Sequence, residues 1–169
     1  ITPLRALNRD IFRRLISFAD TIGLTIKIRH GDTSPYARRK QAIQPPHILI
    51  TTPETLQAIL PASRMKQHLR NVKYVIVDEL HELVASKRGS QLAVSLERLA
   101  VLTGKPFQRI GLSATIGDPL AVSKFLVGPH GQVHIVQVTP SKSMNIIVEH
   151  PIPTEKDEME AKNLRWRPQ

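Results

Sequence analysis

The chain of 169 residues contains no cysteine, which excludes disulfide bonds, cysteine-ligated zinc and thiol catalysis. It also has no apolar run near the ~20 residues needed to span a bilayer. The opening stretch Ile1–Arg5 carries a single charge and no apolar core, so it lacks the pattern of a secretory signal peptide. Because a chain without cysteine is compatible with a reducing compartment, we expect a cytoplasmic protein with no membrane partner.

Acidic residues are also scarce. The chain has 14 Asp and Glu against 24 Lys and Arg, for a net charge of +10. The imbalance is concentrated between Thr21 and Val77, where the sequence has nine basic residues and only two acidic ones, Asp32 and Glu54. A field of this sign attracts polyphosphates, and nucleic acid above all. A basic surface that only keeps the protein soluble is the simpler alternative.

Short β-like runs alternate with stretches of helical periodicity, which is typical of βαβ units and a parallel sheet. Apolar residues recur at helical spacing from Leu4 to Phe18 and again from Leu92 to Leu99. Pro119 follows a good N-cap residue, Asp118, where a further helix should begin. The expected strands are Leu24–Arg29, His47–Thr51, Lys73–Val77, Gln108–Leu112, Val133–Val138 and Met144–Glu149.

One of these runs, Tyr74–Val77, leads directly into two adjacent carboxylates, Asp78 and Glu79. The carboxyl ends of parallel strands are where ligands bind in open α/β folds. One carboxylate could hold a hydrated Mg²⁺ while the other orients or deprotonates a water molecule, which is the chemistry of nucleoside triphosphate hydrolysis. The alternative is an ordinary helix start, where acidic residues are favoured anyway.

A second polar group, Ser113-Ala114-Thr115, follows the apolar run Ile110–Leu112. It should therefore lie at another strand end, beside Asp78 and Glu79. Its two hydroxyls could bind a carboxylate or relay its position to a neighbouring element, whereas a polar turn is the plainer interpretation.

Two familiar catalytic patterns fail on one residue each. His81-Glu82 opens like the H-E-x-x-H zinc helix, but Ala85 stands where the second histidine belongs. The run that begins at Gly111 resembles the nucleophile elbow G-x-S-x-G, but Thr115 stands at the final glycine. These departures exclude a zinc peptidase and an α/β-hydrolase.

Threonine–proline pairs mark two further junctions between a strand and a helix. Thr2 and Thr52 are expected N-caps, and Pro3 and Pro53 are expected first helical residues, with Glu54 following the second pair. Helix N-termini offer unpaired N–H groups that suit phosphate oxygens and could follow a nucleic-acid backbone. Ordinary helix capping explains either junction taken alone.

Three basic or flexible positions could extend such a surface. Arg5 adds charge beside the first junction, and Gly31-Asp32 forms a tight turn after a strand, where the glycine permits close backbone approach. Arg88 could place a guanidinium near phosphate, although a solvated basic loop is equally consistent with the sequence.

Taken in order, these segments resemble the first RecA-like domain of superfamily 2 helicases of the DExH type, and most closely the Lhr (large helicase-related) family. The resemblance covers about residues 1–140, and Ser86–Leu99 is similar to Lhr proteins specifically. The segments that carry it are Thr2–Leu7 as motif Ia, Arg29–Thr33 as the next contact, Thr51–Leu56 as motif Ib, Asp78–His81 as the Walker B box and Ser113–Thr115 as motif III.

The resemblance implies a RecA-like α/β fold, a mostly parallel sheet flanked by helices, that is incomplete at the N-terminus. Residues 141–169 would be a partly disordered connector toward a second RecA-like domain of the same protein. ATP and Mg²⁺ would be the cofactors: Asp78 would bind Mg²⁺ through water, and Glu79 would lie beside the metal and activate the hydrolytic water. His81, Ser113 and Thr115 would couple the two domains. Nucleic acid would contact Pro3, Arg5, Gly31, Asp32, Thr52, Pro53, Glu54 and Arg88.

The chain departs from the family in having no G-x-x-x-x-G-K-[ST] phosphate loop and no second RecA-like domain within its 169 residues. Since it begins at Ile1, we expect an excised piece that is inactive by itself. The prediction is part of an ATP-dependent helicase or translocase that acts on DNA or RNA. The alternatives are a basic nucleic-acid-binding module with a degenerate nucleotide site and, disfavoured by the charge pattern, a protein-interaction scaffold.

Overall fold

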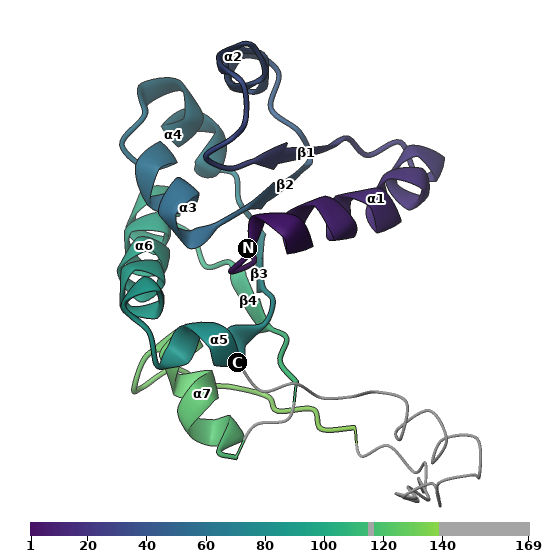
Figure 1. Cartoon of the computed structure of the whole chain (residues 1–169). Coiled ribbons are helices and arrows are strands. Elements are labelled where there is room, and N and C mark those ends of the chain that lie inside the picture. Colours follow the sequence, from purple (N-terminus) through teal and green to yellow (C-terminus); the bar gives the residue numbers. More distant parts are fainter. Residues whose placement is uncertain (115–116, 139–169) are drawn as a thin grey trace, which may run out of the picture. The chain divides into compact units, whose positions relative to one another are not determined.

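The computed structural model describes residues 1–114 and 117–138, and residues Ile1–Ile135 form one compact unit (Figure 1). Thr115, the strand expected at Met144–Glu149 and the connector expected from residue 141 lie outside the described residues. Among the described residues, no helix is both long and apolar enough to cross a bilayer.

Helices and short strands alternate along this unit, so the predicted α/β class is confirmed. The elements are α1 (Arg5–Thr21), β1 (Ile26–Arg29), α2 (Pro35–Ile43), β2 (Ile48–Thr51), α3 (Pro53–Ile59), α4 (Ser63–Leu69), β3 (Tyr74–Val77), α5 (Leu80–Val84), α6 (Lys87–Thr103), β4 (Gln108–Gly111) and α7 (Pro119–Val127).

The described strands form two parallel pairs, β1 with β2 and β3 with β4. The first two residues of the chain join these pairs. The Thr2 N–H donates to the carbonyl oxygen of Thr51 at the end of β2 (3.0 Å), and the Ile1 nitrogen donates to that of Ile76 in β3 (2.7 Å). The Asp78 N–H donates back to the Ile1 oxygen (2.9 Å). The carboxyl ends of all these segments therefore meet along one edge.

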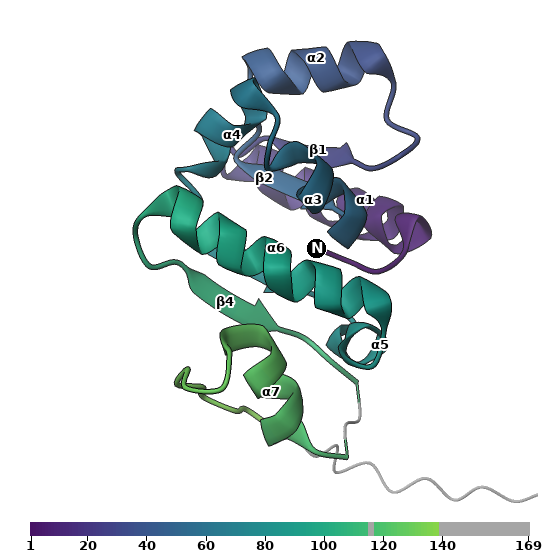
Figure 2. The ribbon, with the colours of Figure 1, turned by 90° about the vertical axis from the view of Figure 1, so that its left-hand side faces the viewer.

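Helices cover the strands from two sides (Figure 1). Helix α1 packs on β1 and β2 around a small core of Ala19, Ile26 and Ile50. Helices α3, α4 and α6 lie on the other side, where α6 runs in front of the strands (Figure 2). The main core is built there from β3 and α6, in which Val77 and Leu92 are fully buried.

Two of the three predicted helix caps are present. Thr52 accepts a hydrogen bond from the Thr55 N–H (3.4 Å) at the start of α3, and Asp118 accepts one from the Ala121 N–H (3.0 Å) at the start of α7. Both helices have proline in the first turn.

The predicted cap at Thr2 is wrong. Helix α1 begins at Arg5, and its N-cap is Leu4, which makes no side-chain capping bond. Thr2 stays extended because its backbone pairs with Thr51, so the helix cannot begin until the chain has left the sheet. The Thr2 hydroxyl donates instead to Oδ1 of the buried Asn8 (2.6 Å).

The strand predicted at Val133–Val138 is also wrong, because the segment has no regular secondary structure. Alternating apolar residues make a strand only where a neighbouring strand offers hydrogen bonds, and none of the described strands pairs with this segment. The side chains of Val136 and Val138 are 77% and 86% exposed, so no packing replaces the missing pairing.

Between α5 and α6 the chain turns a tight corner that has no room for a side chain. Ser86 caps α6 by accepting a hydrogen bond from the Gly89 N–H (3.1 Å). A Cβ atom on Gly89 would overlap the carbonyl oxygen of Leu83 and press on the ring of Phe125 (3.3 Å). Only glycine lets the two helices approach this closely.

We predict that Gly89→Ala lowers the free energy of unfolding by about 1–3 kcal/mol, because the added methyl group forces the α5–α6 corner apart. Chemical denaturation of the chain measures the change. The matched control is Ser90→Ala at the next, exposed position, which should stay within about 0.5 kcal/mol of the unmodified chain. Equal stability of the two variants would show that the corner can relax.

Candidate functional site

Asp78 and Glu79 follow β3 directly, and the backbone between them is unusual. Glu79 has φ 50° and ψ 47°, and it is the single non-glycine residue with positive φ in the described part of the chain. The left-handed conformation is strained for a residue with a side chain as large as glutamate, and such strain is concentrated at functional sites. The Glu79 N–H donates to Oδ1 of Asp78 (3.0 Å), which fixes one carboxylate oxygen of the pair.

The neighbouring contacts explain why the strain is tolerated. Leu80 is buried in the main core, and its N–H donates to the carbonyl oxygen of Leu112, the residue after β4 (3.0 Å). The Glu79 carbonyl oxygen accepts a bond from the Glu82 N–H (3.0 Å), which opens α5. Tertiary packing thus holds Glu79 in the turn and leaves its side chain 40% exposed at the sheet edge.

His81 joins the carboxylates to the end of β4. Its Nδ1 lies 2.9 Å from the Ser113 hydroxyl, and its Nε2 lies 3.5 Å from Glu79 Oε2 and 3.6 Å from Glu82 Oε1. The structure therefore brings Ser113 beside the acidic pair, but through the imidazole and not by a direct bond to a carboxylate. Thr115, expected in the same group, lies outside the described residues.

Asp78 offers few ligands for a divalent cation. In residues 1–114 and 117–138 no three acidic, histidine or cysteine side chains cluster in a way that could hold a metal. Asp78 contributes a single carboxylate, with one oxygen already bound to the Glu79 N–H. This set fits Mg²⁺ that keeps most of its water and takes further oxygens from substrate phosphates, and it does not fit an all-protein metal cage.

A hollow of about 790 Å³ lies farther along the same edge, between the ends of β1 and β2 and the starts of α1, α3 and α6. The residues predicted to contact nucleic acid divide into three groups. Pro53 is buried within the first turn of α3, and Asp32 reaches the hollow only through its ion pair with Arg5. Those that line the hollow are Pro3, Arg5, Gly31, Thr52, Glu54 and Arg88.

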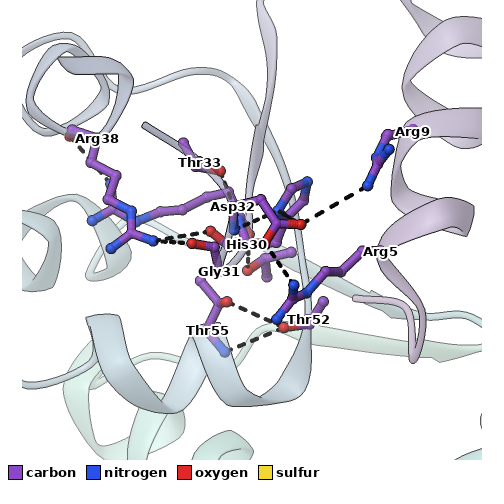
Figure 3. A network of polar contacts seen from close by, with 11 residues as sticks. Arg5, Arg9, His30, Gly31, Asp32, Thr33, Arg38, Thr52 and Thr55 are labelled. Carbon is purple, nitrogen blue, oxygen red and sulfur yellow. Dashed lines mark hydrogen bonds and ion pairs between the residues drawn. The ribbon is translucent and has the colours of Figure 1, made fainter. Parts of the chain in front are cut away.

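On the α1 side of the hollow, Arg5 and Asp32 form a close ion pair (Figure 3). Arg5 Nη1 donates to Asp32 Oδ1 (2.6 Å), and Arg9 Nη2 lies 3.9 Å from the other carboxylate oxygen. The guanidinium of Arg5 lies against Gly31, where a Cβ atom would come within 2.8 Å of Nη2. Because glycine has no side chain, this turn leaves the space that the Arg5 guanidinium occupies in the hollow.

On the α6 side, Arg88 binds two other segments at once. Its Nε and Nη2 donate to the two carboxylate oxygens of Glu54 (2.5 and 3.2 Å), and Nη2 also donates to the Pro3 carbonyl oxygen (2.6 Å). The hydrogen bond from Arg88 lowers the pKa of Glu54, and the same contact raises the pKa of Arg88. Arg88 thus holds the start of α3 and the segment before α1 against α6.

The sequence reasoning missed two further arginines that line the hollow, Arg29 at the end of β1 and Arg38 in α2. Arg29 Nη1 donates to the carbonyl oxygen of Arg38 (3.2 Å) and to Gln41 Oε1 (3.3 Å). Burial lowers the pKa of Arg29, and the charge of Arg38 adds to this. Both residues were included in the excess of positive charge, and only the placing of Arg29 at a strand end could have singled one of them out.

Comparison with known proteins agrees with this geometry. The family model described as DEAD/DEAH box helicase matches residues 1–123. The "ATP-dependent helicase Lhr-Core" of Sulfolobus acidocaldarius is 44% identical over 161 residues, which cover 90% of this chain and 18% of that protein. The "Lhr helicase/ probable uracil glycosylase" of Mycolicibacterium smegmatis is 42% identical over 165 residues, which cover 90% of this chain and 11% of that protein.

Solved structures give the same result. The Mycobacterium smegmatis helicase Lhr bound to ssDNA and AMP-PNP superposes with a TM-score of 0.70 at 43% identity, over 76% of this chain and 18% of that one. The DUF1998 helicase MrfA bound to DNA and AMPPNP superposes with a TM-score of 0.65 at 33% identity, over 76% and 19%. The chain thus spans about a fifth or less of the length of these relatives. The predicted RecA-like fold and the resemblance to Lhr helicases are confirmed, and the chain belongs to the DEAD/DEAH box helicase family.

Proposed function

We propose that this chain is part of an ATP-dependent helicase or translocase, in which hydrolysis of Mg-ATP drives movement along a nucleic-acid strand. The observation that carries the proposal is the placing of two different sites on one sheet edge. The strained carboxylate pair Asp78–Glu79 ends β3, and the arginine-lined hollow lies at the ends of β1 and β2. Nucleotide chemistry and nucleic-acid binding could then be linked through the β-strands that carry both sites.

In the nucleotide half, Asp78 would hold Mg²⁺ through water, and Glu79 would orient and deprotonate the attacking water. When bound, the metal would neutralise charge on the phosphates, which is a large part of catalysis in phosphoryl transfer. His81 lies between Glu79 and Ser113 and would keep the carboxylate aimed at the water. We assign His81, Ser113 and Thr115 to the contact with a second RecA-like domain, whose closure would complete the site.

The phosphate cradle must come from outside these residues, since the sequence has no G-x-x-x-x-G-K-[ST] loop. We therefore assign ATP turnover to a longer protein that carries this chain. The relatives that are named ATP-dependent helicases, and the related structures with AMP-PNP bound, support this assignment.

In the nucleic-acid half, the hollow would hold the phosphodiester backbone of a single DNA or RNA strand. Pro3, Arg5, Gly31, Thr52 and Glu54 would form its floor and sides, with Asp32, Pro53 and Arg88 supporting them. Phosphate contacts of this kind fix the position of a strand without reading its bases. The related Lhr and MrfA structures with DNA bound support a nucleic-acid ligand.

Arg88 would connect the two halves. It belongs to the first turn of α6, which follows α5 and the carboxylate turn, and it binds Pro3 and Glu54 on the other side. A displacement of the α5–α6 corner on nucleotide binding would therefore move Arg88 and, through it, Pro3 and Glu54 at the floor of the hollow.

We predict that Glu79→Gln, in a longer protein that carries this chain, lowers the turnover number for ATP by about 10²- to 10⁴-fold, because the amide cannot accept the proton of water. Affinity for single-stranded DNA should be retained. A steady-state ATPase assay and a binding titration measure the two quantities. The matched control is Glu82→Gln, which removes an exposed carboxylate on the same imidazole and should hydrolyse ATP normally. Undiminished turnover in Glu79→Gln would remove this residue from the role of catalytic base.

The Arg88–Glu54 pair gives a prediction about pH. Because the folded-state pKa of Glu54 is lowered from its ordinary value of 4.5, the ionised carboxylate stabilises the fold at neutral pH. This contribution is lost as the pH falls below 4.5 and through the lowered pKa. The side chain is about half exposed, so we expect Glu54→Gln to cost no more than ~1 kcal/mol near neutral pH.

The deficit of Glu54→Gln relative to the unmodified chain should shrink in acid, because protonation of the carboxylate removes the charge that distinguishes the two chains. Denaturation of the two chains at about pH 7 and about pH 3.5 tests this. Glu82→Gln is the control, since among the described residues its carboxylate has no lysine or arginine within ion-pair distance. A deficit of the same size at both pH values would show that the pair contributes nothing through ionisation.

A further inference from the structure

The four arginines that line the hollow differ in whether a carboxylate neutralises them. Arg5 is paired with Asp32, and Arg88 is paired with Glu54. In the part of the chain that the structure describes, Arg29 and Arg38 make no ion pair at all. The uncompensated positive charge of the hollow is therefore concentrated at the end of β1 and on α2.

Neutral acceptors fix the positions of these two guanidinium groups. Arg29 Nη1 donates to the Arg38 carbonyl oxygen and to Gln41 Oε1, while Arg38 Nη2 donates to the carbonyl oxygens of Gly31 (2.7 Å) and His30 (3.3 Å). The Arg38 Nε is buried, and it has no hydrogen-bond partner within the described residues. Acceptors within the protein thus fix the positions of both guanidinium groups, but no carboxylate among the described residues neutralises their charge.

This arrangement is costly unless an anion binds. Two like charges held close together in a partly buried hollow repel each other more strongly than they would in water. Burial and the neighbouring charge of Arg38 lower the pKa of Arg29, as expected when no carboxylate offsets them. Guanidinium groups bind phosphate oxygens through paired N–H donors, so an incoming phosphate would supply the counter-charge that the protein does not.

We propose that Arg29 and Arg38 form the principal phosphate-binding subsite of the hollow and take one phosphodiester group of the bound strand. The inference rests on the proposed function, since it names the position where the nucleic-acid backbone is held. Arg5 and Arg88 then serve mainly as positioning residues that shape the hollow through Asp32 and Glu54. Figure 3 shows Arg38 and Arg5 on opposite sides of the His30–Asp32 turn, so the strand would cross from the α1 side toward α2.

The test is a salt series of binding titrations with a fluorescent oligothymidylate and a longer protein that carries this chain. Each phosphate contact that is lost should lower the magnitude of the slope of log K against log salt by about 0.7 for a single strand. We expect Arg38→Gln to weaken binding about tenfold near physiological salt and to reduce the slope by that amount. Arg29→Gln should behave alike, and Arg38→Lys should keep the slope while losing part of the affinity.

Two controls separate this subsite from general charge. Arg98→Gln removes an exposed arginine on α6 that lines a different hollow, and it should leave both affinity and slope almost unchanged. Arg14→Gln removes an exposed arginine on α1 that Asp10 neutralises and that does not line the hollow, so it should keep the slope. Thermal melting checks that each variant folds. If Arg38→Gln does not fold, Arg38→Lys still tests the subsite, because it keeps the charge and removes the paired guanidinium donors.

The outcomes are distinct. A reduced slope in Arg29→Gln and Arg38→Gln, with an unchanged slope in both controls, supports the subsite. Salt-dependent binding by the unmodified protein that is unaffected by either glutamine variant overturns the subsite and leaves the proposed function standing. Failure of the unmodified protein to bind the oligonucleotide overturns the proposed function, and the subsite with it.

Discussion

Three main-chain hydrogen bonds fix the positions of the candidate sites relative to one another. They run from Thr2 to Thr51, from Ile1 to Ile76 and from Asp78 back to Ile1, and they join the β1–β2 pair to the β3–β4 pair. Without them the two pairs would have no common edge. With them, the carboxyl ends of parallel segments lie in a row, and a row of such ends is where an α/β sheet binds its ligands.

The two sites on this edge depend on opposite arrangements of charge. At the end of β3, packing of Leu80 forces Glu79 into a strained turn and leaves its carboxylate available at the surface. In the hollow, by contrast, Asp32 and Glu54 neutralise two arginines and leave Arg29 and Arg38 without counter-charge. The edge therefore carries an exposed carboxylate pair and an uncompensated basic hollow, which are the features that the proposed cation and phosphate sites need.

Much of this could be predicted from the sequence, because the deciding forces are local. Apolar runs with β-branched residues gave the four strands, and Thr52-Pro53 and Asp118-Pro119 gave two helix starts, since a cap and a fixed proline φ act within one turn. The adjacency of Ser113 to the acidic pair followed from parallel strand ends. The resemblance named His81 as a coupling residue, but its contacts with Ser113 and Glu79 could not be predicted, because they depend on how α5 is oriented.

The failures share a physical cause, which is competition from distant parts of the chain. Thr2 does not cap α1, because its backbone N–H is bonded to the Thr51 carbonyl oxygen and its hydroxyl donates to Asn8. Val133–Val138 alternates like a strand but finds no described strand to pair with. Arg38 could not be told apart from other basic residues, and the missing counter-charge of Arg29 and Arg38 becomes visible only when every neighbour is in place.

If the proposed function is right, the acidic pair and the arginine-lined hollow act together, so nucleic acid bound in the hollow should change the rate of ATP hydrolysis. The most direct measurement is the rate of ATP hydrolysis by a longer protein that carries this chain, with and without single-stranded DNA or RNA. We expect turnover to rise with added nucleic acid to a plateau, and more salt to be needed to abolish the effect as the nucleic-acid concentration increases. Turnover that is the same at every concentration of both nucleic acids would contradict it.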